Sequence, residues 1–91
     1  MLFRSSRGAI ATDGTHTFEA VPPRIEALSP IGAGDAMAAA FVWAQSRKSD
    51  FIDSVRWAVA EGTATTQLPG MEFATLDQAK QIYKSVEVRE V

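Results

Sequence analysis

Cysteine is absent from this chain of 91 residues, and so are a long hydrophobic run and a strong charge of either sign. Without cysteine, neither a disulfide framework nor a thiolate zinc site can form. The net charge of −2 provides no basic surface for nucleic acid. No apolar segment reaches membrane-spanning length, and the N-terminus lacks the hydrophobic region of a signal peptide. We therefore expect a cytoplasmic protein that binds neither nucleic acid nor membrane.

The composition is that of an ordinary globular domain, with 46% apolar and 22% charged residues. A chain of this length buries roughly 60–65% of its unfolded surface when it folds, which allows one modest core. No repeat, linker or low-complexity segment divides it. The sequence therefore predicts a single domain over residues 1–91.

Short strands and turns are expected before residue 29. Gly8 to Thr12 is compatible with a strand, Asp13-Gly14 favours a two-residue hairpin turn, and Thr15 to Ala20 alternates like a second strand. After two prolines, Arg24 to Leu28 alternates like another short strand. The one histidine, His16, falls in the hairpin, where an exposed position is expected rather than a catalytic one.

The four residues Gly32-Ala33-Gly34-Asp35 stand where this extended part changes into an apolar helix. A glycine-rich turn at a helix start presents free backbone N–H groups at the positive end of the helix dipole, which suits an anion. A carboxylate beside such a site needs a proton or a metal to handle, so general base is the natural role for Asp35. On these four residues alone, ordinary helix capping is the commoner interpretation.

The remainder of the chain reads mainly as helices. Gly34 to about Gln45 is apolar nearly all round, which predicts a helix buried on most faces. Ser49 or Asp50 is expected to cap a second helix that runs to about Thr66. Three further features complete the pattern: a break at Leu68-Pro69-Gly70, a capping box of Thr75 with Gln78 that starts a third helix through about Ser85, and a short strand or tail from Val86 to Val91.

One stripe of the second helix changes from bulky to small residues. Phe51, Val55, Ala58 and Gly62 lie at offsets of 0, 4, 7 and 11, so they share one face. Its small end allows either a neighbouring helix or a flat ligand such as a purine to come close. Helix statistics favour the neighbouring helix.

Taken together and in this order, these pieces resemble the C-terminal part of the ribokinase-like, phosphofructokinase-B family of carbohydrate kinases. The similarity is greatest to the branch that contains 1-phosphofructokinase and tagatose-6-phosphate kinase. The resemblance implies a doubly wound α/β sandwich in which nucleotide binds at the ends of the sheet. The segments that carry it are the Gly8-Ala9 strand, Asp13-Gly14, Pro22-Pro23, Ser29 to Asp35, the apolar helix, Ala58 to Thr65 and Pro69-Gly70.

The resemblance also implies a mechanism. Asp35 would take the proton of a sugar hydroxyl, and Gly32, Ala33 and Gly34 would form the anion hole for the transferred phosphoryl group. ATP with Mg²⁺ is the implied donor, and no residue of the chain is assigned as a metal ligand. The residues implied to form the wall of the nucleotide site are Ser5, Ser6, Arg7, Gly8, Ala58 and Gly62.

Three differences from the family pattern bear on function. Ser5 stands where a glycine is common, which predicts weaker nucleotide binding, and Ser29-Pro30-Ile31 lacks a carboxylate that many ribokinases use near a monovalent cation. These 91 residues do not contain the larger N-terminal part that, by the resemblance, would select the sugar. We therefore expect the isolated chain to be inactive and, because Met37, Phe41 and Trp43 lack cover, to form homo-oligomers. The alternative is a non-catalytic interaction or regulatory module with the kinase fold.

Overall fold

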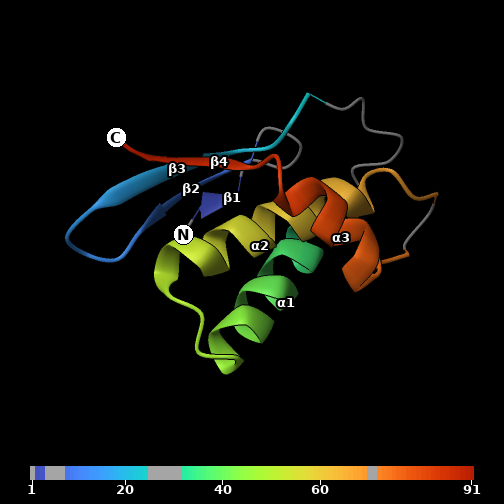
Figure 1. Ribbon diagram of the computed structural model, residues 1–91, viewed down its shortest axis with the longest axis horizontal. Coiled ribbons are helices and arrows are strands. Elements are labelled where there is room, and N and C mark those ends of the chain that lie inside the picture. The colour runs from blue at the N-terminus through green and yellow to red at the C-terminus, as the bar shows by residue number, and fades with distance from the viewer. Residues whose placement is uncertain (1, 4–7, 25–31, 70–71) are drawn as a thin grey trace.

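The computed structural model describes residues 2–3, 8–24, 32–69 and 72–91. Within them, four strands form one sheet in which every pair is antiparallel and the strand order follows the chain. β4 comes from the C-terminal end of the chain and lies beside β3 (Figure 1). The strands are β1 (Leu2–Phe3), β2 (Ala9–Thr12), β3 (Thr17–Val21) and β4 (Glu87–Glu90).

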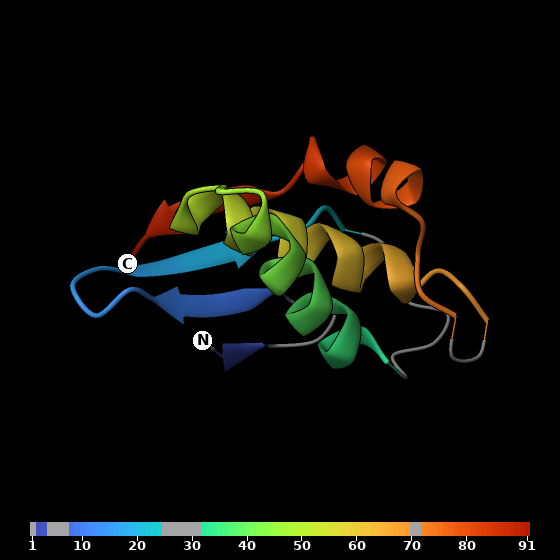
Figure 2. The same ribbon diagram turned by 90° about the horizontal axis from the view of Figure 1, so that it is seen from below.

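Three helices cover one face of this sheet (Figures 1 and 2). They are α1 (Ala33–Ser46), α2 (Phe51–Thr65) and α3 (Leu76–Tyr83). The central helix, α2, contacts β2, β3 and β4, while α1 and α3 both pack against α2. The predicted α/β class is confirmed. The position of α1 matters most for function, because its first turn carries the glycine-rich segment.

Small side chains on the covered face of the sheet let α2 approach closely. Ala9 of β2 pairs with Ala20 of β3, which in turn pairs with Val88 of β4. Ala9 and Ala20 are buried, as are Val55 and Val59 of α2, and all belong to one apolar core. The core therefore lies between the sheet and α2.

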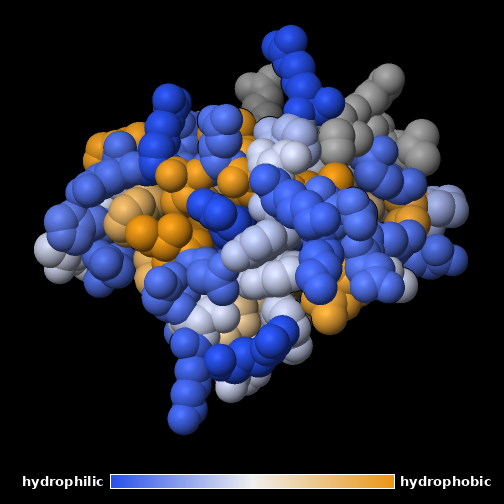
Figure 3. Space-filling view, in the orientation of Figure 1, coloured by the Kyte–Doolittle hydropathy of each residue, from blue (hydrophilic) through white to orange (hydrophobic). Residues whose placement is uncertain are grey.

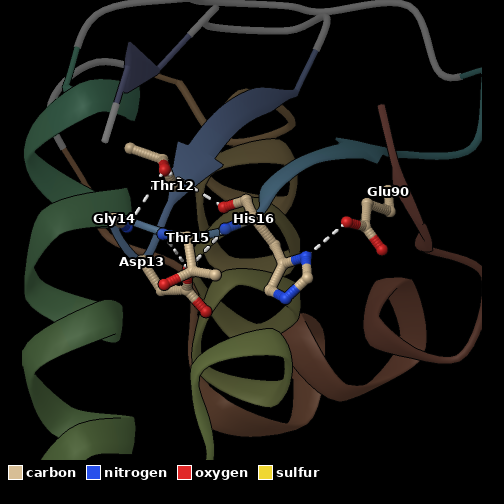
Figure 4. A network of polar contacts seen from close by, with 6 residues as sticks. All are labelled: Thr12, Asp13, Gly14, Thr15, His16 and Glu90. Atoms are coloured by element: carbon tan, nitrogen blue, oxygen red, sulfur yellow. Dashed lines mark hydrogen bonds and ion pairs between the residues drawn. The ribbon is translucent and has the colours of Figure 1, made fainter.

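The hairpin between β2 and β3 has a longer turn than predicted, as Figure 4 shows. Thr12 pairs with Thr17, so four residues, 13–16, form the turn instead of two. The cause is the Asp13 side chain, whose Oδ1 accepts hydrogen bonds from the backbone N–H groups of Thr15 at 2.9 Å and His16 at 2.8 Å. These two amides are thus used within the turn, and β3 starts two residues later than expected.

Both predicted helix caps at the starts of α2 and α3 are present. Asp50 caps α2 by accepting from the N–H of Asp53 at 2.8 Å. Thr75 and Gln78 form the complete capping box of α3, which ends at Tyr83, two residues earlier than predicted. The predicted strand near residues 24–28 falls outside the described residues except for Arg24, which is not in a strand.

The end of α1 uses an unusual residue. Lys48 has φ of 63°, and the N–H groups of Lys48 and Ser49 donate to the carbonyls of Gln45 and Ala44 at 3.0 and 3.1 Å. This pair of bonds is the Schellman arrangement, in which glycine usually occupies the left-handed position. The helix therefore ends at Ser46, one residue beyond the predicted Gln45, with some backbone strain at Lys48.

The prediction that α1 is buried on most faces is wrong. Its fully buried residues are Ala33, Ala36, Met37 and Ala44, whereas Val42 is 67% exposed. The reason is that α1 packs mainly on α2, so its opposite face meets solvent. Met37 is well covered, contrary to expectation, because it inserts against α2.

The large apolar side chains exposed in the described part are Val21, Val42, Ile52, Phe73, Leu76 and Val91. Apolar residues reach the surface in several places in Figure 3.

Candidate active site

Backbone N–H groups in the first turn of α1 have no hydrogen-bond acceptor among the described residues. Gly32 caps the helix with φ of 83° and ψ of −5°, a left-handed conformation that glycine adopts readily, and no side chain in the described residues caps this helix. The first hydrogen bond inside the helix runs from the N–H of Ala36 to the carbonyl of Gly32 at 2.9 Å. The N–H groups of Ala33, Gly34 and Asp35 therefore have no acceptor within the helix. They are placed to bind an anion.

Asp35 lies in this first turn with its side chain exposed. The ion pairs formed among the described residues join His16 to Glu90 and Arg89 to Glu19, so none of them occupies Asp35. Its carboxylate is therefore accessible to a hydroxyl group that arrives from solvent. That accessibility, together with the adjacent donors, is the geometry that a general base beside a phosphoryl group needs.

The space around Gly34 is open. A Cβ atom added to Gly34 would meet no atom of the described protein within 4 Å. The packing of the described residues therefore gives no reason for a glycine there. Ala33, by contrast, is buried and anchors the turn to the interior.

The opposite side of this turn rests on Gly62 of α2. A Cβ atom on Gly62 would lie 2.2 Å from Cγ of Met37 and 3.3 Å from the carbonyl oxygen of Ala33. The first distance is too short for a methyl group, and the second is tighter than an ordinary contact. The small residues at the end of the α2 stripe allowed two explanations, a neighbouring helix or a flat ligand. The structure shows the close approach of a neighbouring helix, α1. Gly62 thereby sets the position of the candidate anion site.

The other residues predicted for the nucleotide wall are buried in the fold or lie outside the described residues. Ser5, Ser6 and Arg7 belong to the latter group. Gly8 has φ of 96°, and a Cβ there would lie 2.0 Å from the carbonyl oxygen of Ala20, so the sheet itself requires a glycine. Ala58 is completely buried in the core. Contacts of Gly8, Ala58 and Gly62 with a nucleotide remain a prediction.

Phe73 is a neighbour of the site that the sequence did not reveal. Its Cε1 lies 3.8 Å from the position of a Cβ on Gly32, and the side chain is 51% exposed. The adjacent Ala74 is held by its N–H, which donates to Oγ1 of buried Thr65 at 3.1 Å. No periodic pattern connects residues 32 and 73, so only the folded chain shows that they meet.

Comparison with known proteins decides the family. The model of the pfkB family of carbohydrate kinases matches residues 3–78. The chain belongs to this family. The identification confirms the resemblance that the glycine-rich segment and its neighbours indicated.

Two relatives of this pfkB-family chain show the extent of the match. It is 31% identical over 77 residues to ATP-dependent 6-phosphofructokinase isozyme 2 of Escherichia coli, a match that covers 85% of this chain and 25% of the relative. It is 46% identical over 61 residues to 1-phosphofructokinase of Borreliella burgdorferi, covering 66% of this chain and 20% of that protein. The chain thus spans a quarter or less of the length of these relatives.

Solved structures confirm the ribokinase-like fold. Phosphofructokinase-2 of Escherichia coli in complex with potassium superimposes with a TM-score of 0.82 at 30% identity, covering 87% of this chain and 26% of that one. Its tetrameric inhibited form gives a TM-score of 0.74, covering 88% and 25%. The described antiparallel sheet and its helices therefore correspond to about a quarter of each of these phosphofructokinase chains. In the described residues, no helix has the length and apolar character needed to cross a membrane.

Proposed function

We propose that this chain supplies the base and the anion site for phosphoryl transfer from ATP to a hydroxyl group of a sugar or sugar phosphate. The observation that carries the proposal is the uncapped start of α1, with Asp35 exposed in the same turn. The pfkB family consists of carbohydrate kinases, and the relatives above are phosphofructokinases. A free anion site and an adjacent carboxylate are the groups that this reaction requires.

In the proposed reaction, Asp35 accepts the proton of the sugar hydroxyl while the hydroxyl oxygen attacks the γ-phosphorus of ATP. The bond from that phosphorus to the β–γ bridging oxygen breaks, and ADP leaves. The N–H groups of Ala33, Gly34 and Asp35 donate to the phosphoryl oxygens, where negative charge develops. Since these donors are fixed by the helix, they need no reorganisation during the reaction. The left-handed Gly32 directs the chain into this turn, and the open space at Gly34 admits the phosphoryl group.

Magnesium fits this site as a partner of the nucleotide. The described residues contain no group of three or more acidic, histidine or cysteine side chains that could hold a metal ion. Mg²⁺ usually keeps several waters and binds substrate phosphates, so it would arrive with ATP, and no residue of the chain is assigned as its ligand. Bound there, the metal would reduce the repulsion between the phosphates and the carboxylate.

The proposal also covers the nucleotide wall, the sugar substrate, the location of the protein and its self-association. Ser5, Ser6, Arg7 and Gly8, together with the buried small residues of α2, would shape the nucleotide wall. The sugar or sugar phosphate would bind only in a complete kinase, and a cytoplasmic location is expected. Self-association is favoured by the exposed Val42 and Leu76, which lie on α1 and α3. These exposed apolar residues also favour the alternative function, a non-catalytic interaction module.

The test uses a kinase that contains this segment and compares Asp35→Asn with the unchanged enzyme. Loss of the general base should lower kcat at least about 100-fold while the KM for ATP changes little. Asp77→Asn is the matched control, because Asp77 is likewise an exposed aspartate in the first turn of a helix. If Asp35→Asn retains the activity of the control, Asp35 is not the base and the interaction module is favoured.

A further inference from the structure

A hollow lies between the three helices. It has a volume of about 220 Å³, and its walls come from all three helices. The two indole rings of the chain meet here edge to face, with centroids 5.4 Å apart. Asp35 does not line this hollow. The lining residues are Ala36, Ala39, Ala40 and Trp43 of α1, Trp57 and Glu61 of α2, and Leu76 and Ala79 of α3.

Glu61 is the one ionisable side chain in this otherwise apolar lining. Its carboxylate is half-buried, and Oε2 accepts a weak hydrogen bond from Oγ1 of Thr65 at 3.5 Å. The ion pairs formed among the described residues do not include it. A carboxylate removed from water without a cationic partner is costly, so the hollow favours a ligand that brings positive charge.

The chemistry of the lining narrows the class of ligand. A metal ion needs several oxygen ligands, and the lining offers one carboxylate. An anion would be repelled by Glu61, and a neutral apolar molecule would leave the carboxylate unpaired. We propose that the three-helix hollow binds a small organic ammonium ion, whose charge pairs with Glu61 and whose carbon atoms contact the alanines and the two tryptophans.

The charged groups around the hollow leave this pairing available. On α1, the guanidinium of Arg47 lies over the Trp43 ring, 4.7 Å from its centroid. On α3, the ring of Tyr83 stacks on Trp57 and its hydroxyl donates to Asp53 of α2. Asp35, Asp77 and Lys80 are next in the chain to the lining residues Ala36, Leu76 and Ala79, and all three are exposed. Arg56 of α2 lies over the ring of Tyr83.

The pKa of Glu61 is shifted by its burial and by Thr65 rather than by these charged groups. Burial raises the pKa of its carboxyl to about 7, and the hydrogen bond from Thr65 offsets part of that rise. The carboxylate population in the empty protein therefore increases between about pH 6 and pH 8. Binding of a ligand with a permanent positive charge should strengthen over the same range.

Choline is a suitable probe, because it carries a permanent charge and does not absorb where tryptophan does. Its neutral isostere, 3,3-dimethyl-1-butanol, has the same shape without the charge. Both are titrated into the 91-residue chain at pH 8 while tryptophan fluorescence is followed, since Trp43 and Trp57 are the only tryptophans and both line the hollow. Choline should bind saturably and about fivefold more tightly than the alcohol, which is the upper end of the effect expected for a partly exposed ion pair.

Three variants separate the proposal from simpler explanations. Glu61→Gln should abolish the preference for choline and its dependence on pH, while Glu87→Gln, which removes an exposed carboxylate of β4, should change neither. Ala39→Leu should block both ligands by filling the hollow. Circular dichroism verifies that each variant is folded.

Several results would overturn the proposal. These are no saturable choline binding, equal binding of the two isosteres, or a choline affinity that Glu61→Gln leaves intact. A dimer that dissociates in Ala39→Leu, detected by light scattering, would likewise show that a second copy fills the hollow.

Discussion

Replacing Gly62 by alanine tests how α1 is seated on α2. The added Cβ would lie 2.2 Å from Cγ and 2.9 Å from Sδ of Met37. Both distances are shorter than the ordinary contact range of 3.4–4 Å. Met37 is 1% exposed, so its side chain cannot simply move into solvent. Overpacking of this kind typically costs about 1–3 kcal/mol, whereas alanine is about 1 kcal/mol better than glycine inside a helix. We expect Gly62→Ala to lower the free energy of unfolding by about 1 kcal/mol.

Met37→Ala supplies the matched background. Alone, it should cost about 2–5 kcal/mol, because it empties a buried site. In that background the methyl group of residue 62 has room, so Gly62→Ala should become stabilising by up to about 1 kcal/mol. Urea unfolding followed by tryptophan fluorescence measures all four corners of this cycle. Stabilisation of the unchanged protein by Gly62→Ala would refute the close seating, since helix propensity would then act alone.

Three other predictions concern stability, strain and association. Because the pKa of Glu61 is raised by burial to about 7, the protonated form favours folding, so stability is complete below about pH 4.5 and falls as the pH rises through 7. Because Glu61 is half exposed, the effect of this pKa shift on stability is reduced, and Glu61→Gln should raise the free energy of unfolding at pH 8 by about 1 kcal/mol in urea unfolding. An equal pH dependence of stability in Glu61→Gln and the unchanged chain would contradict this. Lys48→Gly should raise the free energy of unfolding by up to about 1 kcal/mol in the same assay, because glycine adopts the left-handed conformation without strain. Lys48→Ala keeps that strain and should not stabilise the chain. Equal effects of the two substitutions would argue against strain at residue 48. Val42→Lys should reduce self-association in light scattering, since Val42 is 67% exposed on α1, and an unchanged mass would place the contact elsewhere.

Local signals in the sequence predicted most of the elements. The Asp50 cap and the Thr75–Gln78 capping box mark the starts of α2 and α3 because each side chain bonds a backbone N–H only three residues away. The small end of the α2 stripe likewise indicated a close contact, and Gly62 makes it with α1. Such features depend on neighbours in the chain, so they can be read without the fold.

Features that depend on distant residues were harder to predict. Apolar composition suggested that α1 is buried all round, but burial depends on what packs against a helix, and Val42 faces solvent. His16 was predicted to be exposed, which is correct, but its Nδ1 lies 2.5 Å from Oε2 of Glu90, a partner 74 residues away (Figure 4). The same limit applies to Phe73, which approaches Gly32 only after folding.

The candidate site itself was identified from its residue types rather than from periodicity. Gly32 and Gly34 predicted an accessible turn, and the structure provides the left-handed cap and the open space. The phosphate-binding and base roles depend on chemistry with a bound substrate and therefore remain proposals.

The most direct measurement is to map an anion onto the chain by nuclear magnetic resonance. The backbone amide signals of a ¹⁵N-labelled sample are followed during titration with magnesium-ATP and, separately, with inorganic phosphate. The N–H groups of Ala33, Gly34 and Asp35 have no acceptor within α1, so their signals should move most and saturate together. The start of α2 is the internal control, because Asp50 already occupies the N–H of Asp53 there. Unchanged signals at residues 33–35 with both ligands, in a sample that is folded, would contradict an anion site at the start of α1.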